Sequence, residues 1–124
     1  MDYIWFDTIK KIESKNPPDF QEKEIWFCYL GKNIGTEQNG SGKNFQRPVI
    51  IIKKFNNMSA MTAPLTSIIK DGKYYFTVNL NNKKSSIIIS QIRFLSAKRL
   101  LYKIGKINDF DYIKLKRKIR KNIF

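Results

Sequence analysis

The chain has 124 residues, a typical length for one domain, and its 24 Lys and Arg against 10 Asp and Glu give a formal net charge of +14. It contains no His and one cysteine, Cys28, which excludes Ser-His-Asp and Cys-His catalysis, nearly every zinc-hydrolase ligand set, disulfides within the chain and Cys-rich metal sites. The surplus of positive charge favours a polyanionic partner, either nucleic acid or an anionic membrane surface.

The first segment has apolar residues at helical spacing over residues 2–14, and this pattern predicts a short amphipathic helix. Pro17 and Pro18 end the helix, because proline cannot continue a helix and restricts the residue before it. We therefore expect residues 1–20 to form a helix and a linker, and residues 21–124 to form the main domain.

Short apolar segments separated by turn residues occupy the middle of the chain. Strands are predicted at residues 24–30, 48–52, 58–65, 74–78 and 86–89. Turns are predicted at Asn56-Asn57, Asp71-Gly72 and Asn81-Asn82. Of these turns, Asp71-Gly72 is a strong hairpin signal. Short strands at regular spacing are typical of a small, strongly bent antiparallel sheet or barrel.

The last third of the chain is richer in positive charge, with 12 Lys and Arg and 2 Asp from Lys84 onward. Residues 96–101 predict one or two helical turns, and residues 104–107 predict a short strand. A terminal helix is predicted from about Asp109, with Asn108 as its N-cap. No apolar run approaches the roughly 18 residues that span a bilayer, and the first residues show no secretory signal. We therefore expect a soluble, cytoplasmic protein with no membrane partner.

A long polar loop and four short motifs carry most of the functional information. The loop covers residues 31–46 and contains four glycines, and long loops in small domains are usually functional. The motifs are Gly35-Thr36-Glu37-Gln38-Asn39-Gly40, Arg47-Pro48-Val49, Ala63-Pro64-Leu65-Thr66-Ser67 and Ser90-Gln91-Ile92-Arg93. In this order they resemble the pattern of the MazF/PemK toxins of bacterial toxin–antitoxin systems, and the resemblance runs from about Ile25 to the C-terminus.

The resemblance implies a fold that is mainly β with α: a small SH3-like, partly open antiparallel barrel with a C-terminal helix. It also implies a homodimer that acts as a sequence-specific, metal-independent endoribonuclease on single-stranded mRNA. Such a protein needs no cofactor, inhibits growth and is silenced by a cognate acidic antitoxin. The chain departs from the family pattern in its extra N-terminal helix, in Thr36 where the family usually has Ser, and in an insertion over residues 41–46.

Position by position, Arg47 and Thr66 match the two main catalytic residues of the family, and Glu37 matches its loop carboxylate. We also expect RNA contacts from residues of the loop and of the strand ends. These are Gln38, Asn39, Lys43, Phe45, Ser67, Gln91 and Arg93. No metal site is expected.

The chemistry of these side chains suits RNA cleavage. RNA supplies its own nucleophile, the 2′-hydroxyl, so the protein needs only a proton acceptor, a cation for the developing phosphorane charge and an acid for the leaving oxygen. Either Glu37 or Arg47 could accept the first proton. The planar donors of Arg47 match phosphate geometry, and Thr66 can hydrogen-bond a non-bridging oxygen.

Each of these residues also has a purely structural alternative. Glu37 could be a solvated loop residue, Arg47 could cap a strand or pair with Glu37, and Thr66 could be an ordinary turn hydroxyl. Two other functions compete with the nuclease, namely a non-catalytic toxin on the same barrel that poisons a topoisomerase and a simple nucleic-acid-binding module. The topoisomerase poisons do not need an Arg and Thr pair, so Arg47 together with Thr66 favours the nuclease.

Overall fold

The computed structural model of the chain describes residues 16–30 and 46–124. The elements, in order, are β1 (Glu24–Tyr29), β2 (Gln46–Asn56), β3 (Ser59–Thr66), β4 (Tyr75–Leu80), β5 (Lys83–Ile88), η1 (Ile89–Gln91), β6 (Arg93–Ser96), η2 (Ala97–Arg99), β7 (Leu100–Lys106) and α2 (Asp109–Ile123). The predicted N-terminal helix and all of the predicted loop except Gln46 lie outside the described residues.

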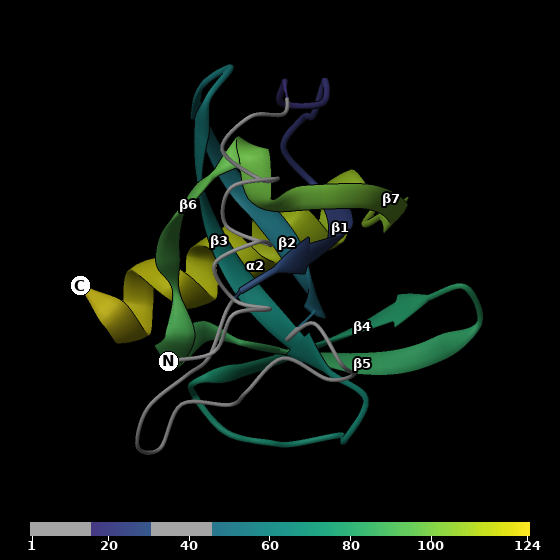
Figure 1. The fold of residues 1–124 in the computed structure, drawn as a ribbon. Coiled ribbons are helices and arrows are strands. Elements are labelled where there is room, and N and C mark those ends of the chain that lie inside the picture. Colours follow the sequence, from purple (N-terminus) through teal and green to yellow (C-terminus); the bar gives the residue numbers. More distant parts are fainter. Residues whose placement is uncertain (1–15, 31–45) are drawn as a thin grey trace, which may run out of the picture.

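Within these residues the strands form one seven-stranded antiparallel sheet in the order β4-β5-β3-β2-β1-β7, with β6 paired to β3 (Figure 1). Strand β3 is the branch point, because β2 covers one of its edges while β6 and β5 share the other. Ser59–Thr62 pair with β6, whereas Leu65 and Thr66 pair with β5. The sheet bends without closing, which confirms the expected partly open barrel with a C-terminal helix.

Two hydrophobic cores lie on opposite faces of the sheet, and β2 contributes to both. Ile50 and Ile52 belong to the core that α2 covers, whereas Val49 and Ile51 belong to the other. This alternation follows from the two-residue period of a strand, and it shows that β2 is buried on both faces. Helix α2 adds Tyr112, Leu115 and Ile119 to the first core. At its start, the side chain of Asn108 accepts a hydrogen bond from the backbone N–H of Asp111 at 2.7 Å, which confirms the predicted N-cap.

The prediction of a hairpin at Asp71-Gly72 is wrong. Gly72 does turn the chain, since its φ is +126° and its carbonyl accepts a hydrogen bond from the N–H of Tyr75 at 3.2 Å. However, β4 pairs with β5 and not with β3. The hairpin forms at Asn81 and Asn82 instead, where φ values of +51° and +66° give the mirror-image turn that suits the twist of two paired strands.

The predicted helical turns at residues 96–101 are also wrong for the most part. Ala97–Arg99 form one short 3-10 turn, and the chain is extended again from Leu100. The reason is tertiary, because Leu100 pairs with Cys28 of β1 and starts a seven-residue strand there. Strand β6, only four residues long, was not predicted.

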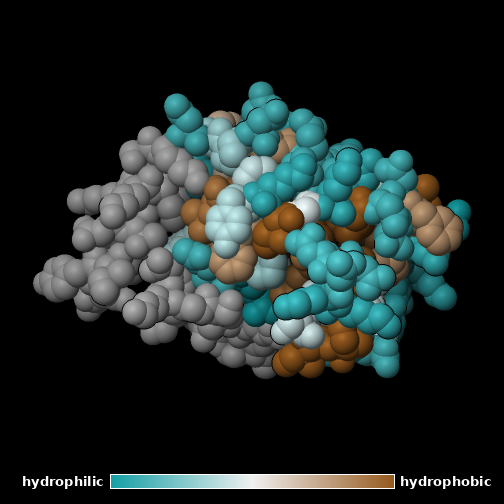
Figure 2. Space-filling view, turned by 90° about the vertical axis from the view of Figure 1, so that its right-hand side faces the viewer, coloured by the Kyte–Doolittle hydropathy of each residue, from teal (hydrophilic) through white to brown (hydrophobic). Residues whose placement is uncertain are grey.

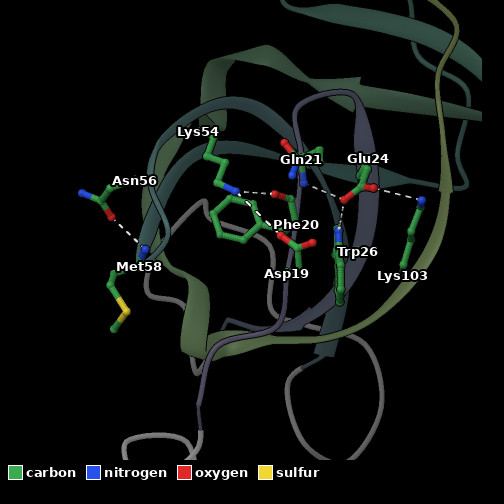
Figure 3. Close-up of polar contacts among 9 residues, drawn as sticks. All are labelled: Asp19, Phe20, Gln21, Glu24, Trp26, Lys54, Asn56, Met58 and Lys103. Carbon is green, nitrogen blue, oxygen red and sulfur yellow. Dashed lines mark hydrogen bonds and ion pairs between the residues drawn. The ribbon is translucent and has the colours of Figure 1, made fainter.

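The segment before β1 is fixed by polar contacts at the first end of that strand (Figure 3). The carboxylate of Glu24 accepts hydrogen bonds from the N–H of Gln21 at 2.7 Å and from Nε1 of Trp26 at 3.1 Å, and it pairs with Nζ of Lys103 at 2.9 Å. Nearby, Nζ of Lys54 donates to the carbonyl of Phe20 at 2.8 Å. These contacts tie β1 to β7, and they tie the segment before β1 to β2.

On the side of the molecule that carries β7 and the β4–β5 hairpin, the surface is mostly hydrophilic, with hydrophobic groups interspersed (Figure 2). No helix among the residues described is long and apolar enough to pass through a membrane.

Candidate functional site

The last residues of β1 and the first residues of β2 lie side by side and place Arg47. Arg47 is directly opposite Cys28 of β1, and Cys28 is in turn opposite Leu100 of β7. The side chain of Arg47 therefore projects on the same face as Cys28 and as Val49, two residues further along β2. Only 8% of the Arg47 surface is exposed, which is unusual for an arginine.

The register of β2 with β3 brings Thr66 to the same place. Val49 pairs with Pro64, so continuing the antiparallel register by two residues on each strand sets Arg47 opposite Thr66. Because alternate residues share a face, both side chains lie on the face that Val49 and Pro64 occupy. Thr66 is buried and pairs on its other side with Ser86 of β5.

The hydroxyl groups of Thr66 and Ser86 fix the turn that follows β3. Oγ1 of Thr66 accepts a hydrogen bond from the N–H of Ile68 at 3.2 Å, and Oγ of Ser86 accepts one from the N–H of Lys70 at 3.0 Å. A hydroxyl has two lone pairs and one hydrogen. The contact with Ile68 uses one lone pair of Thr66 and leaves its hydrogen to donate to a ligand oxygen.

The charges of three arginines act on Cys28, whose thiol is free and buried. Burial raises the pKa of Cys28 to about 12, and the positive charges of Arg93, Arg99 and Arg47 act in the opposite direction. Three different elements therefore bring their arginines near one buried thiol: β6, η2 and β2. Arg99 reaches the end of β1 directly, where its Nη1 donates to the carbonyl of Tyr29 at 3.3 Å.

Burial also disfavours the charged form of two of these groups. It lowers the pKa of the Arg47 guanidinium, and it lowers the pKa of the Arg99 guanidinium, to which the charge of Arg93 adds. Within the described part of the chain, neither Arg93 nor Arg99 forms an ion pair with a carboxylate. A half-buried group of like charges is stabilised by an anion, so this face suits a negatively charged ligand.

The predicted site residues divide into three groups. The register of β2 with β3, continued past Val49 and Pro64, puts Arg47 and Thr66 on one face, and the charge of the exposed Arg93 acts on Cys28 as that of Arg47 does. Ser67 is exposed directly after Thr66, and Gln91 is half-buried at the end of η1. The other predicted residues lie outside the described ones: Glu37, Gln38, Asn39, Lys43 and Phe45.

Sequence reasoning missed Arg99. It lies in the stretch that was predicted as helical, and no motif includes it. Its position depends on the pairing of β1 with β7 and on a hydrogen bond between residues 70 positions apart. The only signal in the sequence was the general excess of cations in the last third.

A cavity on the other face of the sheet shares none of its residues with this site. It has a volume of about 250 Å³ and lies between α2 and the sheet, lined by Ile52, Met61, Tyr112 and Ile119 among others. Ile52 and Tyr112 belong to the core on the opposite face from Arg47. No group of three or more His, Cys, Asp or Glu among the residues described could hold a metal ion.

Solved structures of toxins share this fold. The chain matches a crystal structure of an Mtb toxin with a TM-score of 0.54 and 20% identity, covering 60% of this chain and 90% of that one. It matches the Mycobacterium tuberculosis toxin MazF-mt6 with a TM-score of 0.61 and 18% identity, covering 79% and 93% of the two chains. A third match, at a TM-score of 0.66 and 11% identity, covers 85% of this chain and 95% of an endoribonuclease in complex with its cognate antitoxin from a mycobacterial species.

At these identities the three structures support the fold and nothing finer, and no curated protein matches the chain. The family model supports more, because it matches residues 21–123, which is well over half of the chain. It describes the PemK-like, MazF-like toxins of type II toxin–antitoxin systems. With the bent, open sheet, the C-terminal helix and the match over residues 21–123, the chain belongs to the PemK-like, MazF-like toxin family of type II toxin–antitoxin systems.

Proposed function

We propose that this toxin is a sequence-specific, metal-independent endoribonuclease that cleaves single-stranded mRNA. The observation that supports the proposal is the pairing of Val49 with Pro64, because continuing that register by two residues puts Arg47 opposite Thr66 on one face of the sheet. A structural neighbour that is an endoribonuclease, bound to its cognate antitoxin, adds support.

The proposed reaction is an attack of the RNA on itself. The 2′-oxygen forms a bond to the adjacent phosphorus, and the bond from phosphorus to the 5′-oxygen of the next nucleotide breaks. The proton of the 2′-hydroxyl passes to a base on the protein, and an acid on the protein gives a proton to the leaving 5′-oxygen. The products are a 2′,3′-cyclic phosphate and a 5′-hydroxyl, so no metal-bound water is consumed.

Arg47 and Thr66 have complementary roles in this proposal. The Arg47 guanidinium donates to the phosphate oxygens and offsets the negative charge that develops on the phosphorane. The hydroxyl of Thr66, whose oxygen is held by the N–H of Ile68, donates its hydrogen to a non-bridging oxygen. Such preorganised donors need no rearrangement when the charge develops.

The base is Glu37 or Arg47. Burial lowers the pKa of Arg47, which makes it a better proton acceptor than an exposed arginine. The pH–rate profile of Glu37→Gln separates the two assignments. If Glu37 is the base, the variant loses the acidic limb of the profile; if the acidic limb is unchanged, Glu37 is not the base.

Incubation of the protein with a long RNA in EDTA tests the function. We expect discrete fragments that end in 2′,3′-cyclic phosphate and 5′-hydroxyl groups, and we expect them to form far more slowly with Arg47→Ala or Thr66→Ala. RNA that is bound but intact would favour the nucleic-acid-binding module. No binding and no cleavage, together with inhibition of a topoisomerase, would favour the non-catalytic toxin.

The proposal includes the partners that such a toxin needs. A cognate acidic antitoxin is attracted by the +14 net charge and covers the Arg47 face. Residues 21–124 form the toxin domain, which works as a homodimer in the cytoplasm. Gln38, Asn39, Lys43, Phe45, Ser67, Gln91 and Arg93 contact the RNA strand. Light scattering of the purified chain, alone and with a small acidic protein encoded beside it, tests both associations.

A further inference from the structure

We propose that Arg93 and Arg99 form a second phosphate-binding subsite, which holds the RNA backbone phosphate next to the scissile one. The inference rests on the proposed nuclease function and deepens it. Arg93 was predicted only as a general RNA contact, and Arg99 belongs to none of the motifs.

The first argument is position. Arg47 is opposite Cys28 on the β2 side of β1, and the Nη1 of Arg99 donates to Tyr29, the residue after Cys28, from the β7 side. Neighbouring strands lie about 4.8 Å apart, so the backbones of β2 and β7 are separated by roughly 10 Å across β1. Two guanidinium groups that approach from opposite sides of one strand can bind two successive phosphates of a chain that crosses it.

The second argument is charge. Arg93 and Arg99 lie close enough for the charge of Arg93 to act on Arg99, and burial already disfavours the charged form of Arg99. Neither forms an ion pair with a carboxylate of the described residues. An anion between them removes the repulsion, and a phosphate fits because a guanidinium offers it two parallel donors.

The third argument is preorganisation. The contact with Tyr29 occupies one of the five N–H donors of Arg99 and holds the group in place. The backbone of Arg93 is held as well, because its carbonyl accepts a hydrogen bond from the hydroxyl of Thr62 at 3.3 Å. Arg93 is exposed, so an RNA strand can reach the pair from solvent.

The test measures binding and not cleavage. The probe is a single-stranded RNA with a 2′-deoxy nucleotide at the cleavage position, and its affinity is measured by fluorescence anisotropy over a range of KCl concentrations. For single strands, each lost phosphate contact reduces the slope of log K against log[salt] by about 0.7. We expect this loss in Arg93→Gln and in Arg99→Gln. The matched control, Arg117→Gln on the exposed face of α2, should change the slope far less.

A second measurement identifies the phosphate. A methylphosphonate replaces one phosphate of the probe at a time. A methylphosphonate next to the cleavage position should reduce the slope of log K against log[salt] for the wild-type protein. The same methylphosphonate should cause no further reduction for Arg99→Gln. If Arg99 has a purely structural role, the methylphosphonate and Arg99→Gln should each reduce the slope, and the two reductions should add at every position of the probe. That result would overturn the subsite.

The outcomes separate the subsite from the nuclease function. If the wild-type protein cleaves RNA but neither variant changes the salt slope, the subsite is wrong and the nuclease stands. If the protein binds the probe through Arg93 and Arg99 but never cleaves RNA, the nuclease is wrong and the anion subsite stands. Arg99-dependent binding of an acidic peptide without binding of the probe would overturn the phosphate assignment. If Arg99→Gln does not fold, the salt slope of Arg93→Gln still tests the subsite, because Arg93 is exposed and its replacement should not disturb the fold.

Discussion

At its first residue β1 presents a carboxylate, whereas at its last two residues it meets three guanidinium groups. Glu24 accepts hydrogen bonds from Gln21 and Trp26 and pairs with Lys103, so the charges there balance within the protein. At the other end, the charges of arginines from β2, β6 and η2 act on Cys28. The two ends are four to five residues apart, roughly 15 Å along an extended strand.

The fold treats charge differently at the two ends of β1. Burial alone would raise the pKa of Glu24, but the hydrogen bonds from Lys103, Gln21 and Trp26 outweigh it, and the pKa falls below its ordinary value. The ionised form of Glu24 is therefore the one that the fold stabilises. At the guanidinium end, burial lowers the pKa of Arg47 and of Arg99, so the fold disfavours the charged form of each. Neither Arg93 nor Arg99 pairs with a carboxylate among residues 16–30 and 46–124, and this supports the proposed binding of an external anion.

The largest effect should follow from Arg47→Ala. We expect RNA cleavage to fall by roughly a thousandfold, because a preorganised donor to the developing phosphorane charge is lost. Arg47→Lys should recover little, since an ammonium lacks the planar pair of donors. Cleavage rates of an RNA oligonucleotide check this, with Lys121→Ala on the exposed surface of α2 as the control. Full activity in Arg47→Ala would contradict the proposed role of Arg47 in RNA cleavage.

Glu24→Ala should have the largest effect on stability at the other end. The change leaves the Nε1 of Trp26 and the ammonium of Lys103 without their carboxylate, and we expect a loss of about 1–3 kcal/mol in the free energy of unfolding. Urea unfolding measures it. Cleavage by the folded fraction should stay at the wild-type rate. A variant that kept its stability but lost cleavage would reverse the roles assigned to the two ends.

Tyr112→Phe should have a smaller effect, about 1 kcal/mol, because it removes one buried hydrogen bond. The hydroxyl donates to the carbonyl of Ile52 at 2.7 Å and also contacts Glu22, so this site is a reference outside both ends of β1. Burial and the charge of Glu22 raise the pKa of Tyr112 to about 12. The stabilisation is therefore complete below the ordinary tyrosine pKa and is lost as the pH rises toward 12. Alkaline unfolding curves should be flatter for Tyr112→Phe than for the wild type.

The smallest effect should be the acid dependence of Glu24. Because its pKa is lowered in the folded protein, its contribution is present above the ordinary glutamate pKa and is lost as the pH falls through the folded value. Urea midpoints measured from pH 6 downward should therefore drop less steeply in Glu24→Gln than in the wild type. Parallel curves for the two proteins would show that the ionised form of Glu24 does not stabilise the fold.

Much of the fold could be predicted from local pattern. The apolar run of β2 and the turn at Asn81 and Asn82 depend on their own residues, so periodicity and turn preference suffice to place them. The turn at Asp71-Gly72 shows where this fails, since a local turn signal does not say which strands pair. Strand β7 began where a helical turn was predicted, because its start depends on Cys28, far away in the sequence.

The same distinction applies to the site. Arg47 and Thr66 were found because each is part of a short motif at a strand end, and the register of β2 with β3 then brings them together. Arg99 could not be found in that way. Its guanidinium is held by the carbonyl of Tyr29, a contact that exists only after β1 and β7 have paired.

The branching of β3 sets the order in which its partner strands become available during synthesis on the ribosome. Thr66 is synthesised early, but the edge of β3 that holds it in place is completed by β5 and β6, which leave the ribosome much later. An unfinished polypeptide that ends before Lys83 thus contains β1, β2 and β3 but lacks β5 and β6, which pair with the other edge of β3. We expect the β3 amides that face β5 and β6 to exchange with deuterium faster in this fragment than in the full chain, so that a stable position for Thr66 forms only when translation is almost complete.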